Sequence, residues 1–343
     1  MNSVTQRLGR RYGLPLAALL VTLASFALVL WWDDSPGVLL LVAAFGPPVT
    51  ALLLARATVG SGVRWGRMAR AFALGGTLIP AIVIAVHGFV LSVVFALVEP
   101  LTDAGRSLFD DLRVDAELVD VLTNPWAVVF LVELALVAPI AEESLKPLAA
   151  RIVRPGSRRD AFLLGAAAGA GFAAVENVLY ASGWFWSFDW FLPVAVLRST
   201  GAALHLLGAG LISVALYERR ERMENRTSIA GMWGIAVGVH ALWNGSIAVA
   251  IILYEEQARL AGIGGSALEW GIALDVMLGV IGMVLLGAIV VAARWATPDR
   301  PTSVSAMLDL ARPTVIAGWA GLAALMIVPA TIMILVFPEF VAF

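Results

Sequence analysis

The sequence predicts an all-α protein, a polytopic transmembrane helical bundle of about nine spans with the N-terminus in and the C-terminus out. Of its 343 residues, 60% are hydrophobic and only 14% are charged, against about 25% charged residues in soluble proteins. Apolar runs long enough to cross a bilayer recur along the chain. Nearly all basic residues lie in every second segment between these runs, which is the pattern expected for segments on one side of a membrane. These three observations exclude a soluble enzyme and a disordered chain.

The apolar runs are defined by length, because a spanning helix needs about 20 largely apolar residues at a rise of about 1.5 Å each. The predicted runs cover residues 14–32, 37–55, 69–98, 126–146, 161–182, 191–217, 229–254, 268–294 and 314–337. The first run ends in two Trp and two Asp without a small-x-small cleavage site. We therefore expect a retained anchor there and not a signal peptide.

The orientation of the spans follows from the basic residues, because Lys and Arg in short loops are retained on the cytoplasmic side. With the N-terminus inside, 19 of the 23 basic residues fall in cytoplasmic segments. Arg106, Arg113 and Arg259 fall outside, and Arg198 lies within the sixth run. Ten of the 12 tryptophans stand at predicted span ends, where the amphipathic ring prefers the interface.

We expect three regions along the chain. Residues 1–125 form an N-terminal three-span region that ends in an acidic extracytoplasmic segment, 99–125, which contains either a solvated connecting helix or an amphipathic helix on the outer surface. Residues 126–254 form a four-span core, and residues 255–343 form a C-terminal two-span region. The absence of Cys excludes a thiol protease and a Cys-ligated zinc module, and the net charge of −2 argues against a nucleic-acid partner.

Ionisable residues concentrate on the fourth to the seventh runs. A charged group at the bilayer centre costs at least about 2.5 to 3.5 kcal/mol, so each one is a candidate for a functional site. The candidates are Glu133, Glu142, Glu143, Lys146, Glu176, Arg198, His205 and His240. The flanking runs contribute only His87 and Asp275, which we expect to be packed and hydrogen-bonded without catalytic duty.

The fourth run places Glu142 and Lys146 one turn apart on one helix face, in the order that favours an ion pair. Glu143 projects about 100° away from Glu142. An ordinary cytoplasmic helix end with solvated charges has the same pattern. However, Lys146 is the only lysine among 23 basic residues, and it follows a double Glu within an apolar helix.

The next three runs add a second acid, an amide and two histidines. Gly165 and Gly169 are four apart, which allows close helix approach. Glu176 in hydrocarbon needs a cation, a metal or a proton. Arg198 and His205 are seven apart, and His240 and Asn244 are one turn apart. A single buried His is more often a packing residue than a ligand, but two on neighbouring runs beside several Glu favour a site.

This set of side chains supplies what amide hydrolysis needs: a general base, His and Glu side chains for a divalent metal, and an amide N–H for the oxyanion. The sequence contains no His-Glu-x-x-His, no Gly-x-Gly-Asp and no Gly-x-Ser-x-Gly motif. The sequence therefore lacks the motifs that define three classes of intramembrane protease: the His-Glu-x-x-His zinc class, the aspartyl class and the serine class.

Four blocks of this chain resemble the motifs of the PrsW family of intramembrane metalloproteases. The blocks are Glu142-Glu143-x-x-Lys146, Gly171-Phe172-Ala173-x-x-Glu176-Asn177, His205 with Gly208 and Gly210, and His240-x-x-Trp243-Asn244. They occur in the family's order on four successive runs. The chain resembles CAAX-protease and bacteriocin-processing enzymes more distantly, since their second motif carries His where this chain has Glu176.

The resemblance implies an intramembrane endopeptidase that cuts a membrane-anchored protein, an anti-sigma factor in the case of PrsW, as part of regulated signalling. It also implies a multi-pass protein of a bacterial plasma membrane whose catalytic core is 126–254. Glu142 or Glu143 would then be the general base, Lys146 would hold their charges apart, and Asn244 would stabilise the oxyanion.

A divalent metal is expected, with zinc as its expected identity. The expected ligands are Glu176, His205 and His240, although a Glu and His pair can also activate water unaided.

The depths of the candidate residues differ. At about 1.5 Å per residue, Glu142 lies about 24 Å below the outer end of its run and Glu176 about 10 Å below the outer end of its own run. The side chains can meet only if the spans are tilted, if a helix is broken near Pro139, or if the spans are shifted from the predicted runs.

Two other functions are alternatives to a protease. One is a proton-coupled transporter or channel, which uses similar series of Asp, Glu and His residues. The other is a non-catalytic immunity or scaffold protein.

Overall fold

The structure is a computed structural model that describes residues 17, 20, 37–60, 63–111, 125–183, 188–223, 227–260, 284–285 and 287–296. Its helices are α2 (Gly37–Val59), α3 (Trp65–Gly76), α4 (Leu78–Asp111), α6 (Pro125–Val132), the π-helix η1 (Glu133–Val137), α7 (Ala138–Val153), α8 (Arg158–Gly183), α9 (Phe188–Arg220) and α10 (Ile229–Leu260). No strand occurs among the described residues, which confirms the all-α prediction for this part of the chain.

Three helical stretches of the described residues are long and apolar enough to cross a membrane: Trp65–Val93, Arg158–Tyr180 and Gly201–Arg220. Helices also cover the second, fourth and seventh predicted runs. The runs 14–32, 268–294 and 314–337 lie wholly or mostly outside the described residues. The count of nine spans, their orientation and the three regions therefore stay predictions.

Two predicted runs are divided in the structure, and a proline lies near each division. The third run divides at Thr77 into α3 and α4. Pro80 then falls in the first turn of α4, where a missing backbone N–H costs nothing. The fourth run divides into α6, η1 and α7. Pro139 lacks the N–H that would bond to the carbonyl of Ala135, and Ala135 lies within the π-helix. A break in the regular α-helix near Pro139 was one of the expected routes to a common site.

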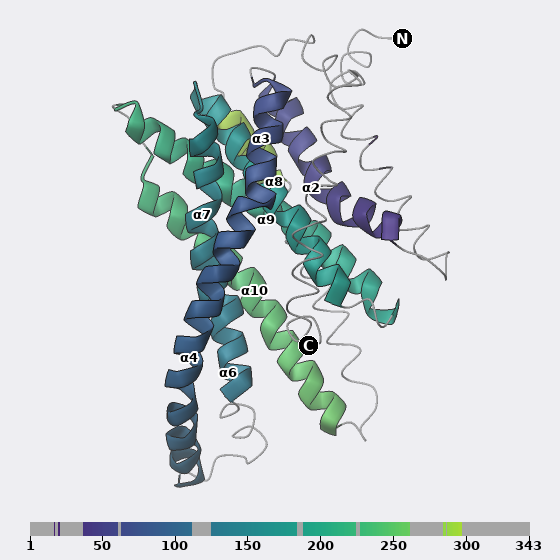
Figure 1. Ribbon diagram of the computed structural model, residues 1–343, viewed down its shortest axis with the longest axis vertical. Helices are drawn as coiled ribbons and strands as arrows, with labels where there is room; N and C mark the ends of the chain where they lie inside the picture. Colours follow the sequence, from purple (N-terminus) through teal and green to yellow (C-terminus); the bar gives the residue numbers. More distant parts are fainter. Residues whose placement is uncertain are drawn as a thin grey trace. The chain divides into compact units, whose positions relative to one another are not determined.

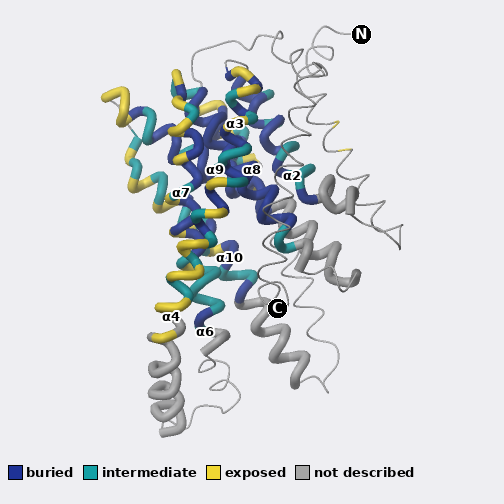
Figure 2. The backbone as a smooth tube through the Cα atoms, viewed as in Figure 1, coloured by how far each residue is buried: buried dark blue, intermediate teal, exposed yellow. Residues whose placement is uncertain are grey.

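The chain forms two compact units, and the first comprises Met1–Pro80, Leu145–Ala236 and Gly279–Phe343. Within it, α8 lies side by side with α9 and also packs against α2 and α3 (Figure 1). Helix α8 is buried along most of its length (Figure 2). A helix that is apolar on all sides belongs in such a central position.

Glycines bring α8 close to both of its main neighbours. A Cβ added at Gly165 would collide with the carbonyl of Ala209, and one at Gly169 with the carbonyl of His205. A Cβ at Gly171 would collide with the carbonyl of Phe72 on α3. The predicted close helix approach is confirmed, and it fixes the backbone of His205 against the helix that carries Glu176.

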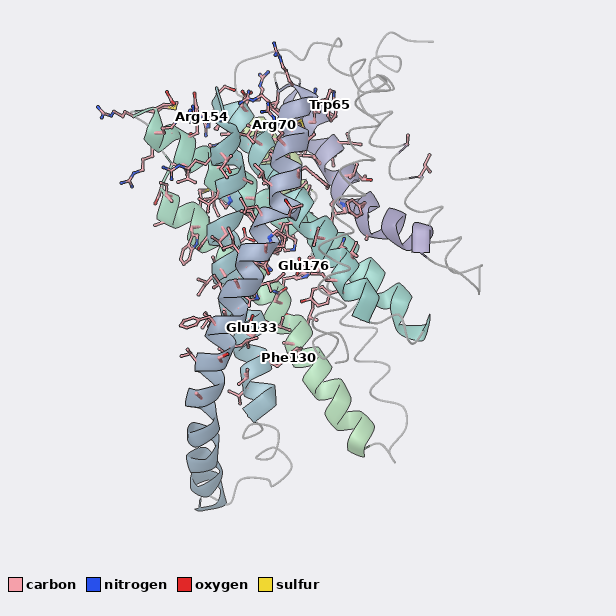
Figure 3. The ribbon with its side chains drawn as sticks, in the orientation of Figure 1. Trp65, Arg70, Phe130, Glu133, Arg154 and Glu176 are labelled. Atoms are coloured by element: carbon pink, nitrogen blue, oxygen red, sulfur yellow. The ribbon has the colours of Figure 1, made fainter. Side chains whose placement is uncertain are left out.

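Ion pairs hold the helix ends of the first unit together. Arg67 lies 3.0 Å from Asp160, Arg158 lies 2.8 Å from the buried Glu218, and Arg220 donates to the carbonyl of Pro155 at 2.8 Å. Trp65, Arg70 and Arg154 lie at the same end of this unit (Figure 3). The arginines predicted for cytoplasmic loops therefore tie the ends of α3, α8 and α9 to each other.

The second unit comprises Ala81–Ser144 and Val237–Leu278. It contains most of α4, all of α6 and η1, the first turns of α7 and most of α10. Large apolar side chains stay exposed on it, among them Phe89 at 72% and Leu242 at 74%. Exposed side chains of this kind fit a surface that faces lipid.

Replacing Gly169 by Ala is expected to lower the free energy of unfolding by about 1–3 kcal/mol, because the added methyl group overpacks the contact with α9. The matched control is Gly66→Ala on α3, since a Cβ there meets nothing within 4 Å. Thermal unfolding of both variants in detergent gives the comparison. Equal stability of the two variants would contradict the close packing of α8 on α9.

Candidate functional site

In the second unit, His240 is contacted at both ring nitrogens by side chains of α7 and α10. Its Nδ1 lies 3.0 Å from Oε1 of Glu143, and its Nε2 lies 3.8 Å from Oε2 of Glu142. The amide Nδ2 of Asn244 lies 3.1 Å from the same Nε2. Two adjacent acids of one helix thus reach opposite edges of one imidazole, because consecutive helical residues point about 100° apart.

These contacts favour one arrangement of donor and acceptor on the ring. An amide Nδ2 only donates, so Nε2 of His240 accepts from Asn244. Nδ1 is then the nitrogen that donates to the carboxylate of Glu143, which only accepts. All four side chains are buried, with Glu143 at 0% and His240 at 1% exposure. Polar groups are tolerated at such depth only with polar partners, and here they supply them to each other.

The same group has the ligand atoms that a divalent metal requires. Glu142, Glu143 and His240 each offer one ligand atom, and these atoms lie within 4.8 Å of one another. Zinc takes imidazole nitrogen at about 2.0–2.1 Å and carboxylate oxygen at about 2.0–2.2 Å. Because Nε2 of His240 and Oε2 of Glu142 are 3.8 Å apart, one ion fits between these two atoms.

In the first unit, His205 lies between a lysine and an acid. Nζ of Lys146 on α7 lies 2.6 Å from Nδ1 of His205 on α9. Nε2 of the same ring lies 2.9 Å from Oε2 of Glu176 on α8. Lys146 is 0% exposed, so its charge depends on these neighbours for compensation.

Phe172 belongs to this second group and was not selected from the sequence as a site residue. Its ring lies 4.4 Å from Nζ of Lys146 and 5.6 Å from the ring of His205. A cation over an aromatic face is stabilised by the quadrupole of the ring. The available signal was the spacing, since Phe172 precedes Glu176 by four residues and so shares its helix face.

The remaining predicted candidates have other surroundings. Asn177 donates its side-chain amide to the carbonyl of Ala44, so it joins α8 to α2 within the first unit. His87 has a polar partner as expected, since its Nδ1 lies 2.9 Å from Glu133. The side chain of Arg198 and the whole of Asp275 lie outside what the structure describes.

Helix α7 contributes to both groups. It supplies Glu142 and Glu143 to the contacts of His240, and Lys146 to the contacts of His205. Both groups combine carboxylate and imidazole in surroundings from which water is largely excluded. Acid–base chemistry and metal binding are the two uses of such a combination.

Comparison with known proteins identifies the family. The model of the PrsW family intramembrane metalloprotease matches residues 64–261. No curated protein and no solved structure matched the chain. The matched residues make up more than half of the chain and include every side chain of both groups. The chain therefore belongs to the PrsW family of intramembrane metalloproteases.

Proposed function

We propose that this protease hydrolyses a peptide bond of a membrane-anchored protein with Glu142 as the general base at a centre built around His240. The observation that supports the proposal is the pair of contacts on opposite edges of that ring. These two contacts support different roles for the two adjacent acids. Glu143 holds the ring through Nδ1, and Glu142 stands on the side of the lone pair of Nε2.

The role of Glu143 follows from how histidines bind metals. A ligating His normally donates its other ring N–H to a carboxylate, which orients the ring and raises its basicity. Glu143 accepts from Nδ1 in this way at 3.0 Å. Nε2 of His240 is therefore the proposed ligand atom, and Glu143 is proposed to orient it. An ion at Nε2 would replace the hydrogen bond from Asn244 and leave that amide able to donate elsewhere.

The proposed ion would be held by Nε2 of His240 with the carboxylate of Glu142 beside it. A divalent ion supplies Lewis-acid chemistry at such a site, which activates water and polarises a carbonyl. The donor set of nitrogen and carboxylate oxygen fits zinc. Zinc is accordingly our proposal for its identity.

In the proposed reaction, one proton is carried from water to the leaving amine by a side chain of this protein. Glu142 takes a proton from water as the water oxygen adds to the peptide carbonyl carbon. The same carboxyl group then gives the proton to the amide nitrogen, and the C–N bond breaks. The side-chain amide of Asn244, one turn from His240, is proposed to donate to the carbonyl oxygen as it becomes negative.

Glu176 and His205 remain proposed metal ligands, as expected from the sequence together with His240. A charged ammonium only donates, so Lys146 requires Nδ1 of His205 to accept and leaves the ring proton on Nε2, toward Glu176. Metal binding at Nε2 would release that proton, because a ligating His must be neutral and unprotonated at the ligating atom. Lys146 is then proposed to orient the ring.

We propose a multi-pass protein of the bacterial plasma membrane with nine spans, the N-terminus in and a catalytic core at 126–254. The substrate class is a membrane-anchored protein, and the cleavage is proposed to serve regulated signalling. An anti-sigma factor is not proposed, because the comparisons give no support for that substrate.

Replacing Glu142 by Gln is expected to lower kcat for cleavage by about 10²-fold or more, because the amide cannot accept the proton from water. Glu143→Gln is expected to cost about 10- to 100-fold, and added metal should recover part of it, because Glu143 acts through His240. The assay is cleavage of a co-expressed single-span protein in reconstituted membranes. Glu221→Gln, an exposed acid paired with Arg220, is the matched control.

Equal losses in the two variants, with no recovery by metal, would contradict the separation of roles. Proton uptake is measured in the same vesicles, since a proton-coupled transporter needs the same carboxylates. Proton flux that disappears in the Glu→Gln variants, with no candidate substrate cut by the parent protein, would establish a transporter.

Metal content gives a separate test. The purified protein is expected to carry a divalent metal, and His240→Ala and His205→Ala are each expected to reduce the bound amount, because each removes a proposed ligand. Elemental analysis of parent and variants measures the stoichiometry, and a chelator should remove activity. Full metal content in His240→Ala would remove that residue from the ligand set.

The proposed topology is tested by cysteines placed in this naturally Cys-free chain. Ser107→Cys in the acidic segment is expected to react with an impermeant thiol reagent in intact cells, and Gly66→Cys only after lysis. Gly66 is a suitable site because a side chain there meets open space. Reaction in the opposite order would invert the orientation.

A further inference from the structure

We infer that His87 and Glu133, together with the π-helix that begins at Glu133, position Glu142 and Glu143 against His240. This inference rests on the proposed function. All of these residues belong to the second unit. Nδ1 of His87 on α4 lies 2.9 Å from Oε1 of Glu133, and the two side chains are 20% and 12% exposed. The pair attaches the first residue of η1 (Figure 3) to α4.

The π-helix determines which way the following residues face. Its hydrogen bonds join residues five apart where an α-helix joins residues four apart. One π turn therefore contains one additional residue, which turns the following helix by about 100° relative to an unbroken α-helix. Glu142 is the fifth residue after the end of η1, and Glu143 is the sixth. Their directions toward His240 depend on this extra residue.

The contact with His240 tolerates little rotation. Glu143 reaches Nδ1 at 3.0 Å, and the adjacent Glu142 faces the other ring nitrogen. A rotation of α7 about its axis by about 100° would point a neighbouring residue, in place of Glu143, toward Nδ1 of His240. Pro139 disfavours a regular α-helix here, but it carries no side-chain group that fixes the π turn to another helix. His87 and Glu133 supply that attachment.

The pair is thus assigned a positioning role and no contact with substrate. His87→Ala and Glu133→Ala are expected to lower kcat by about 10- to 100-fold with KM within about two-fold, because misplacement of the base by about 1 Å costs that much. Glu133→Gln is expected to keep most activity, since its amide oxygen still accepts from His87. Ser92→Ala on the same helix is the control, because its hydroxyl donates to the carbonyl of Gly88 on its own helix.

A readout besides activity separates positioning from general instability. The ¹⁵N NMR signal of Nδ1 of His240, assigned with a His240→Gln variant, is expected to shift in Glu133→Ala and to stay in place in Glu133→Gln. Unchanged kcat and an unchanged signal in Glu133→Ala would overturn the inference. Equal loss of activity in Glu133→Gln and Glu133→Ala would also overturn it, by assigning Glu133 a proton-transfer role. If the Glu142→Gln variant cleaves normally, the proposed function fails instead.

Discussion

Charge buried within apolar helices is the constraint on which the rest of this structure depends. Glu143, Lys146 and His240 are almost completely removed from solvent, and an unpaired ion at such a position costs several kcal/mol even after relaxation. Each acquires a partner from another helix, so α7 is held against α10 in one unit and against α9 in the other. These contacts of buried polar side chains constrain the rotation of α7 about its axis.

Both groups use an imidazole as the bridge between charges. A neutral imidazole has one donor and one acceptor on opposite edges, so a fixed partner on one edge determines what the other edge can do. Glu143 takes the donor of His240 and leaves an acceptor near Glu142. Lys146 takes the acceptor of His205 and leaves a donor near Glu176. The two rings have opposite polarity, although they occur in similar sequence surroundings.

The helices and the candidate residues could be predicted from the sequence, and the directions of the side chains could not. Run length and hydropathy are local properties, so the helical segments from 37 to 254 were anticipated, with an unexpected division at Thr77 and an expected break near Pro139. The prolines were visible, but the additional residue of the π turn depends on packing against α4 through His87. Which acid faces which nitrogen of His240 depends on torsions and interhelical distances that no spacing rule contains. Phe172 was missed because its spacing from Glu176 places it on the same helix face but does not distinguish a site residue from a packing residue.

The single lysine can now be explained by the shape of its site. The other basic residues are arginines, and those described at the helix ends make several hydrogen bonds to carbonyls and acids, as Arg67 and Arg220 do. A planar guanidinium presents five donors and needs acceptors for them, whereas an ammonium is a compact point charge. The compact ammonium of Lys146 lies 4.4 Å from the ring of Phe172 and 2.6 Å from Nδ1 of His205. An arginine at this fully buried position would bring a larger, planar group with five donors into the space that the ammonium fills, so the position favours lysine even in a chain that otherwise uses arginine.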